Sequence, residues 1–311
     1  MKSVQPLIPV NEPFIGDQEK EFVMNCLETG WISSEGIYIR EFEQKWAAYC
    51  GKKFGVAVSN GTVAIEIAIS CLRLNPGDEV IMPSFTIISC AQAVTRANAV
   101  PVLVDCDPET WCMDVNQVEA KITHKTRAIM PVHIYGHPVD MAPVQDLAAK
   151  YHLVIIEDAA EAHGGEYRGQ KCGSFGDLSC FSFYANKIIT TGEGGMVLTD
   201  DEDQAEYLRS LRNLCFKKER RFYHTEIGNN YRLTNIQAAI GLAQIERIEQ
   251  SISHKRWMAS KYFEQLHTLD MLTLPVERPW AKNVYWMYGL VLDPKAGLNA
   301  DLFARRLEEE G

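Results

Sequence analysis

One stretch decides the fold class of this chain: Ser179-Cys-Phe-Ser-Phe-Tyr-Ala-Asn-Lys187-Ile-Ile-Thr-Thr-Gly-Glu-Gly-Gly195. Its apolar beginning predicts a short strand, and its glycine-rich end predicts a turn close to Lys187. Another apolar run, 153–158, ends in an acidic pair, and Asp158 precedes the lysine by 29 residues. The two runs therefore predict a strand that ends in an aspartate and a short strand that leads to a lysine.

An aspartate and a lysine in this arrangement are what an enzyme that uses pyridoxal phosphate requires. The lysine amine forms a Schiff base with the aldehyde of the cofactor. The aspartate keeps the pyridine nitrogen protonated, so that the ring withdraws electrons. We therefore predict Lys187 as the catalytic, cofactor-linked residue and Asp158 as the partner of the ring nitrogen.

Apolar runs alternate with helical segments through most of the chain. Strands are predicted at 54–58, 79–82, 100–104, 127–132, 153–157, 179–183 and 196–199. Helices are predicted at 61–73, 86–97, 114–122, 141–151 and 201–213. This alternation predicts an α/β fold with a mostly parallel central sheet that is covered by helices on both faces.

The flanking regions add further elements. The periodicity predicts helices at 17–28, 38–50, 234–249 and from residues 250 and 299, and a strand at 284–292. Thr234 is the expected N-cap of the long helix. We predict a large cofactor-binding domain at 1–248 and a smaller C-terminal α+β domain at 249–311.

Composition narrows the class of protein. The net charge of −10 over 311 residues argues against nucleic acid as a partner. No apolar run approaches the length of a membrane span, and nine scattered cysteines fit reduced thiols in a cytoplasmic protein. The basic cluster at 217–221 fits a solvated loop better than a phosphate-binding patch. We expect a cytoplasmic protein that works without nucleic acid or membrane.

Three other groups of residues carry chemistry, and each has a second interpretation. Residues 59–62 open a helix, where N–H groups attract phosphate, but Ser-Asn-Gly is also an ordinary turn. Phe85, at a strand end, fits stacking on a flat ring or a place in the core. The acidic residues and histidine at 157–163 could bind a metal, but no second cluster completes the site, so we predict none.

In this order, the motifs resemble the fold-type-I pyridoxal phosphate enzymes of the DegT-type sugar aminotransferase family. The resemblance runs from residue 9 to the last residue. Its most specific stretches are 30–36, 157–164, 173–177, 181–196 and 230–241. Family members typically continue beyond the equivalent of Gly311, so the resemblance implies that the small domain is incomplete.

The resemblance implies a role for each residue of the site. Lys187 would form the Schiff base and move protons, Asp158 would pair with the pyridine nitrogen, and Phe85 would stack on the ring. Glu161 would lie near the 3-hydroxyl group of the cofactor. The cofactor phosphate would be held by four polar or small residues: Gly61, Thr62, Ser182 and Asn230. Asn230 would come from a partner subunit, so that a homodimer would share its active sites.

The reaction is also implied by the resemblance. A related dehydratase branch carries histidine in place of Lys187, so the lysine indicates transamination. The implied substrate is a nucleotide-linked 4-keto-6-deoxy sugar, with GDP-4-keto-6-deoxymannose favoured, and glutamate would donate the amine and leave as 2-oxoglutarate. The product would serve surface polysaccharide or O-antigen synthesis. The alternatives are amination of a dTDP- or UDP-linked keto sugar and a protein that binds pyridoxal phosphate without turnover.

Overall fold

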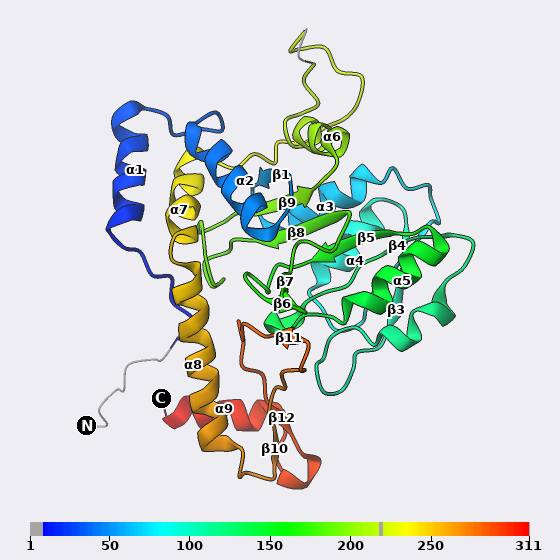
Figure 1. Cartoon of the computed structure of the whole chain (residues 1–311), viewed down its shortest axis with the longest axis vertical. Helices are drawn as coiled ribbons and strands as arrows, with labels where there is room; N and C mark the ends of the chain where they lie inside the picture. Colours follow the sequence, from blue (N-terminus) through cyan, green and yellow to red (C-terminus); the bar gives the residue numbers. More distant parts are fainter. Residues whose placement is uncertain (1–8, 218–219, 311) are drawn as a thin grey trace.

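A seven-stranded sheet forms the centre of the computed structural model, which describes residues 9–217 and 220–310 (Figure 1). Its strands are β1 (Phe54–Val58), β2 (Glu79–Pro83), β3 (Val100–Val104), β4 (Thr126–Ile129), β5 (Val154–Asp158), β8 (Leu178–Ser182) and β9 (Gly195–Thr199). The order across the sheet is β1-β9-β8-β5-β4-β2-β3. The strands from β8 to β3 are parallel, and β9 runs antiparallel to both of its neighbours. The predicted α/β fold with a mostly parallel sheet is confirmed.

Helices cover both faces of this sheet. The helices of the described residues are α1 (Asp17–Thr29), α2 (Ile37–Cys50), α3 (Gly61–Cys71), α4 (Ile88–Arg96), α5 (Met141–Tyr151), α6 (Glu202–Arg212), α7 (Asn235–Ile245), α8 (Ile248–Leu266) and α9 (Ala300–Glu310). Of these, α8 extends away from the sheet, and α9, which buries no residue, lies in the C-terminal part (Figure 1). Because neighbouring strand residues point to opposite faces, Ile156 packs with α3, α4 and α6, whereas Ile155 packs with α5. Phe181 packs with α2 and α7 on the face that α5 covers. The core therefore lies in two layers, one on each side of the sheet.

The C-terminal part is tied to the large sheet region by short strands. β11 (Ala281–Lys282) pairs with β6 (Glu166–Tyr167), which pairs with β7 (Gln170–Lys171). β10 (Leu272–Thr273) pairs with β12 (Val291–Leu292). Four 3-10 turns complete the elements: Val115–Gln117, Glu119–Lys121, Ile134–Gly136 and Pro294–Ala296.

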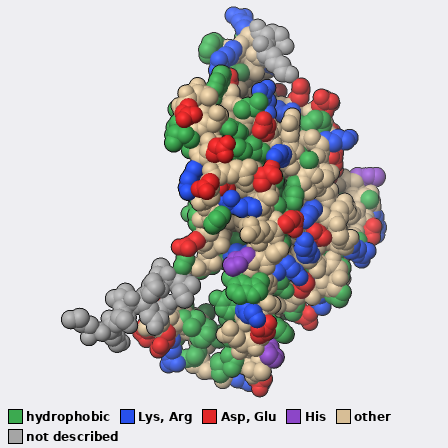
Figure 2. Space-filling model, turned by 60° about the vertical axis from the view of Figure 1, so that its left-hand side comes forward, with side chains coloured by type: hydrophobic (Ala, Val, Ile, Leu, Met, Phe, Trp, Pro, Cys, Tyr) green, Lys and Arg blue, Asp and Glu red, His purple; other side chains and the backbone are tan. Residues whose placement is uncertain are grey.

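Acidic and basic side chains are interspersed on the face shown in Figure 2, without a broad area of one sign. Such a mixed surface offers no extended basic footprint on that face. In the ranges 9–217 and 220–310, no helix is both long and apolar enough to cross a membrane.

Two predicted helices are wrong in part. Residues 114–122 form two 3-10 turns, because the Asp114 carboxylate accepts a hydrogen bond from the Asn116 N–H at 3.1 Å and holds the chain in a tight turn. The helix predicted at 234–249 is broken between α7 and α8 at Arg247. The Arg247 guanidinium bonds Glu19 and donates to the Phe14 carbonyl at 2.8 Å, so contacts with the N-terminal segment fix its backbone. Thr234 is the N-cap of α7, as predicted.

The strand predicted at 284–292 is also wrong over most of its length. Only its last two residues form β12, within the described chain. The Val284 N–H donates to the Gly136 carbonyl at 3.2 Å, and Val284 is fully buried. This segment therefore packs against a turn of the large region instead of forming a strand.

Candidate active site

A cavity of about 730 Å³ lies beside the N-terminus of α3 and the carboxyl ends of β5 and β8. It is lined by Asn60, Gly61, Thr62, Val63, Glu66, Ile87, Arg96, Glu161, Ser182, Tyr184, Asn186, Lys187, Glu193, Tyr231 and Trp286. Five residues predicted for the site are among these: Gly61, Thr62, Glu161, Ser182 and Lys187. Segments that lie far apart in the sequence therefore meet at one edge of the sheet, where parallel α/β folds place their ligands.

Lys187 projects into this cavity with a side chain that is only 9% exposed. Its Nζ lies 4.0 Å from Oε1 of Glu161 and 3.7 Å from the ring centroid of Trp286. Burial lowers the pKa of the Lys187 amine, and the negative charges of Glu161 and Asp158 act in the opposite direction. The net direction is downward, which suits an amine that must give up a proton near neutral pH.

Asp158 ends β5 and is buried. Its Oδ1 accepts from the Ala160 N–H at 3.0 Å, and its Oδ2 accepts from the Cys90 S–H at 3.1 Å. Burial raises the pKa of Asp158, although these two donors and the charge of Lys187 oppose the rise. No sequence pattern pointed to Cys90, because a cysteine on the buried face of α4 looks like any core residue.

Glu161 is held in the cavity by the main chain of Tyr135, whose N–H donates to Oε2 at 2.7 Å. Burial raises the pKa of Glu161 to about 7, and the nearby Lys187 charge works against this rise. The carboxyl group is therefore poised to change its protonation near neutral pH. Tyr135 also contacts Phe85 edge-on, with ring centroids 5.9 Å apart. Phe85 is 42% exposed, so the interpretation as a core residue is wrong.

The start of α3 forms an anion cradle from residues 60–62 and Ser182. The Asn60 side chain caps the helix by accepting from the Val63 N–H at 2.9 Å. Among the described residues, no group accepts a hydrogen bond from the N–H of Gly61 or Thr62. A Cβ on Gly61 would lie 2.6 Å from the Cβ of Ser182, so only glycine allows this approach. Free N–H groups at a helix start suit a phosphate.

Asn230 does not line the cavity of its own chain, although the next residue, Tyr231, does. Asn230 forms an isolated bridge with Asn213 at the base of the segment that joins α6 to α7. Figure 1 shows the described residues of this segment projecting from the body of the molecule. The phosphate role of Asn230 stays a prediction.

His163 is a core residue. Its ring lies 5.4 to 5.5 Å from the rings of Trp46, Phe181 and Phe183. Burial lowers the pKa of His163 to about 3, so the imidazole is neutral at physiological pH. The neutral ring therefore packs among these aromatic side chains.

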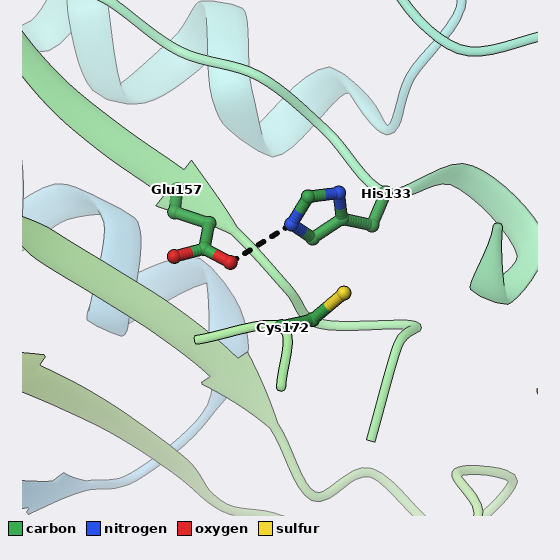
Figure 3. Close-up of side chains that lie close together, drawn as sticks. All are labelled: His133, Glu157 and Cys172. Atoms are coloured by element: carbon green, nitrogen blue, oxygen red, sulfur yellow. Dashed lines mark hydrogen bonds and ion pairs between the residues drawn. The ribbon is translucent and has the colours of Figure 1, made fainter. Parts of the chain in front are cut away.

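A second buried cluster, formed by His133, Glu157 and Cys172, offers atoms that a metal could use (Figure 3). The oxygens of Glu157 already accept from five groups: His133 Nε2, the N–H groups of Gly173, Phe175 and Gly176, and the Ser179 hydroxyl. Burial also raises the pKa of the Cys172 thiol well above its usual range, which makes it a poor ligand. The cluster is best understood as a clamp that fastens the loop 173–176 to β5.

Glu157→Gln is expected to lower the free energy of unfolding by about 3 kcal/mol at pH 7, because an amide cannot accept from all five donors. Burial alone would raise the pKa of Glu157, but the His133 hydrogen bond and the loop N–H groups bring it below its ordinary value of 4.5. The stability that the ionised Glu157 contributes is therefore fully present above pH 4.5, and it is lost as the pH falls through the lower pKa of the folded state.

Urea unfolding of the wild type and this variant between pH 3 and 8 measures the effect. We expect the gap between the two curves to be constant above about pH 5 and to close in acid. A gap that stays the same down to pH 3 would contradict the assignment.

The comparison with protein families decides the classification. The model of the DegT/DnrJ/EryC1/StrS aminotransferase family matches residues 13–311. This chain belongs to that family. It is a sugar-aminotransferase homologue with the fold-type-I architecture expected from its motifs, and the cofactor of the family is pyridoxal phosphate.

Relatives of known name share most of the chain. GDP-perosamine synthase of Caulobacter vibrioides is 45% identical over 98% of this chain and 83% of its own length. GDP-perosamine synthase of Escherichia coli O157:H7 is 45% identical over 91% of this chain and 78% of its own length. The crystal structure of the aminotransferase TlmJ from Streptoalloteichus hindustanus is 30% identical, with a TM-score of 0.93 over 98% of this chain and 83% of that one.

Proposed function

We propose that this protein transfers an amino group to C4 of GDP-4-keto-6-deoxymannose and so makes GDP-perosamine. The observation that carries the proposal is the meeting of Lys187, Glu161 and the α3 anion cradle around one cavity, with Asp158 buried at the end of β5. Two GDP-perosamine synthases at 45% identity support the choice of substrate. The predicted place of the product in polysaccharide synthesis follows from the same likeness.

The residues of the site fit pyridoxal phosphate, because a backbone cradle for an anion and the largely buried Lys187 line one cavity, and the buried carboxyl group of Asp158 lies close enough to act on the lysine charge. When bound, this cofactor supplies an electron-withdrawing ring that carries the amino group. Gly61, Thr62 and Ser182 would hold the phosphate.

The acidic and basic side chains of the site take different parts in holding and moving protons. Asp158 is fixed by the Ala160 and Cys90 donors, and its carboxylate would keep the ring nitrogen of the bound cofactor protonated. Lys187, with its lowered pKa, moves a proton at the substrate carbon. Glu161, whose pKa is about 7, lies near enough to bias the charge of that amine. Phe85 would offer its exposed ring for stacking.

We infer further that the working unit is a homodimer with shared active sites and that glutamate is the amino donor. The support for the dimer is the position of Asn230, which lies outside its own cavity on a projecting segment. Glutamate is supported by the family resemblance. The division into domains at 1–248 and 249–311 also stays a proposal, since the C-terminal part contributes Trp286 to the cavity wall.

A panel of nucleotide-sugars tests the substrate. With glutamate as donor, we expect GDP-4-keto-6-deoxymannose to be aminated about a hundredfold faster, in kcat/KM, than the dTDP- and UDP-linked 4-keto-6-deoxy sugars. Product mass and the release of 2-oxoglutarate are measured together. Equal or faster turnover of a dTDP- or UDP-linked sugar would contradict the proposal that the substrate is GDP-linked. Retained cofactor with no 2-oxoglutarate would favour a binding protein without turnover.

A further inference from the structure

Trp286 belongs to the C-terminal part of the chain, yet its side chain lines the cavity and is only 7% exposed. The Lys187 Nζ lies 3.7 Å from the centroid of its ring. Among the described residues, no oxygen or nitrogen accepts a hydrogen bond from this Nζ, and the nearest carboxylate oxygen, Oε1 of Glu161, is 4.0 Å away. The ring face is thus the closest favourable contact of the amine.

The position of the Trp286 ring is fixed by polar contacts at both ends of the residue. Its Nε1–H donates to the Asn186 carbonyl at 2.7 Å, next to the lysine. The same carbonyl accepts from the Asn11 side chain. The Trp286 carbonyl accepts from the Nζ of Lys255 at 3.3 Å, a buried lysine of α8. These hydrogen bonds hold both the ring and the backbone of Trp286 in place.

The neighbouring backbone is docked on the turn that holds Glu161. Next to the Val284 contact described above, the Met287 N–H approaches the Tyr135 carbonyl at 3.5 Å. A Cβ on Gly136 would lie 2.7 Å from Val284 Cγ2 and 3.1 Å from the Trp286 nitrogen, and Gly136 has φ +100°. The close approach needs glycine, so Trp286 and Glu161 are placed by one turn.

We propose that Trp286 is a positioning residue for Lys187, whose ring face holds the free amine in the cavity and keeps water away from it. A cation is attracted to an indole face, and the attraction grows when water is excluded. The charged and titratable groups that face the amine are Glu161, Asp158 and the neutral His163. The proposal rests on the proposed function only in naming Lys187 as the reactive lysine.

The test measures the chemical reactivity of Lys187 in the full chain freed of cofactor. Acetic anhydride is the probe, and mass spectrometry follows the acetylation of this one residue as a function of pH. The variants are Trp286→Leu and Trp286→Phe, and Trp257→Leu, at a 56% exposed tryptophan of α8, is the matched control. Circular dichroism and the melting temperature establish that each variant is folded.

We expect Trp286→Leu to raise the limiting acetylation rate at high pH about tenfold, because the amine loses its contact and becomes accessible. Two opposing changes act on the midpoint of its pH profile: loss of the indole face removes a contact that favours the protonated amine, and relief of burial favours that form, so the limiting rate is the deciding measurement. Trp286→Phe keeps an aromatic face but loses the Nε1–H bond to Asn186, so its rate should lie between those of the wild type and the leucine variant. Trp257→Leu should behave like the wild type.

The proposal is overturned if Trp286→Leu has the limiting rate of the wild type, or if Trp286→Phe is as reactive as the leucine variant. Acetylation needs no turnover, so the outcome does not depend on which sugar is the substrate. A failed substrate panel with a normal acetylation profile would remove the proposed function and leave the role of Trp286 standing.

Discussion

Lys187→Ala is expected to lower the rate of amino transfer by about 10⁴-fold or more. Lys187 is the one lysine among the residues that line the described cavity, so no other amine is placed to move the proton. The substitution removes a largely buried side chain without a hydrogen-bond partner at its Nζ, and the fold should persist. Product formation per active site measures the loss, and borohydride reduction followed by mass spectrometry measures covalent attachment of the cofactor to residue 187.

Lys261→Ala is the matched control, since this lysine lies on α8 and forms an exposed ion pair with Glu264. It should keep full activity and full cofactor attachment. Residual activity of Lys187→Ala above a hundredth of the wild type would rule out its assigned role, as would a cofactor still linked to the chain.

Asp158→Asn is expected to reduce kcat by about 10³-fold, because a neutral amide cannot stabilise the positive charge of a protonated ring nitrogen. The two donors on Asp158, the Ala160 N–H and the Cys90 S–H, need acceptors. An asparagine can satisfy one of them through its oxygen, so a modest loss of stability is expected as well. Single-turnover rates with the amino donor measure the chemical step, and a cofactor titration measures binding.

Asp200→Asn provides the comparison for this variant. Asp200 follows β9 directly, as Asp158 ends β5, but it is half-exposed and pairs with Lys52. It should leave kcat unchanged. If Asp158→Asn lost stability but kept its single-turnover rate, the carboxylate would be a structural group and its contact with the ring nitrogen would be wrong.

Much of this site could be predicted because its residues follow strands of a parallel sheet. Lys187, Glu161 and Ser182 lie after or at the ends of β5 and β8, and the apolar runs that form those strands are plain in the sequence. Parallel strands bring their carboxyl ends to one edge, so motifs far apart in the chain meet there. The local pattern was enough to predict Lys187, while the places of Glu161 and Ser182 in the site were implied by the family resemblance.

Other features of the fold and of the site could not be predicted, because they depend on contacts between segments that lie far apart in the sequence. Trp286 and Cys90 are ordinary apolar residues by pattern, and only packing places one over the lysine and the other beside Asp158. The break at Arg247 likewise coincides with an ion pair to Glu19, more than two hundred positions away. The apolar periodicity continues through that point, because it depends on which side chains are apolar and carries no information about contacts with the N-terminal segment.

The anion cradle at the start of α3 is made of main-chain N–H groups and of a position that has no side chain. A site of this kind depends on the backbone conformation and only little on the side chains around it. Side chains elsewhere on the cavity wall, such as Ile87 or Tyr184, can therefore be substituted without removing these N–H groups. Substitutions in the wall would change which sugar the cavity accepts, while the N–H groups of the helix start would stay in place.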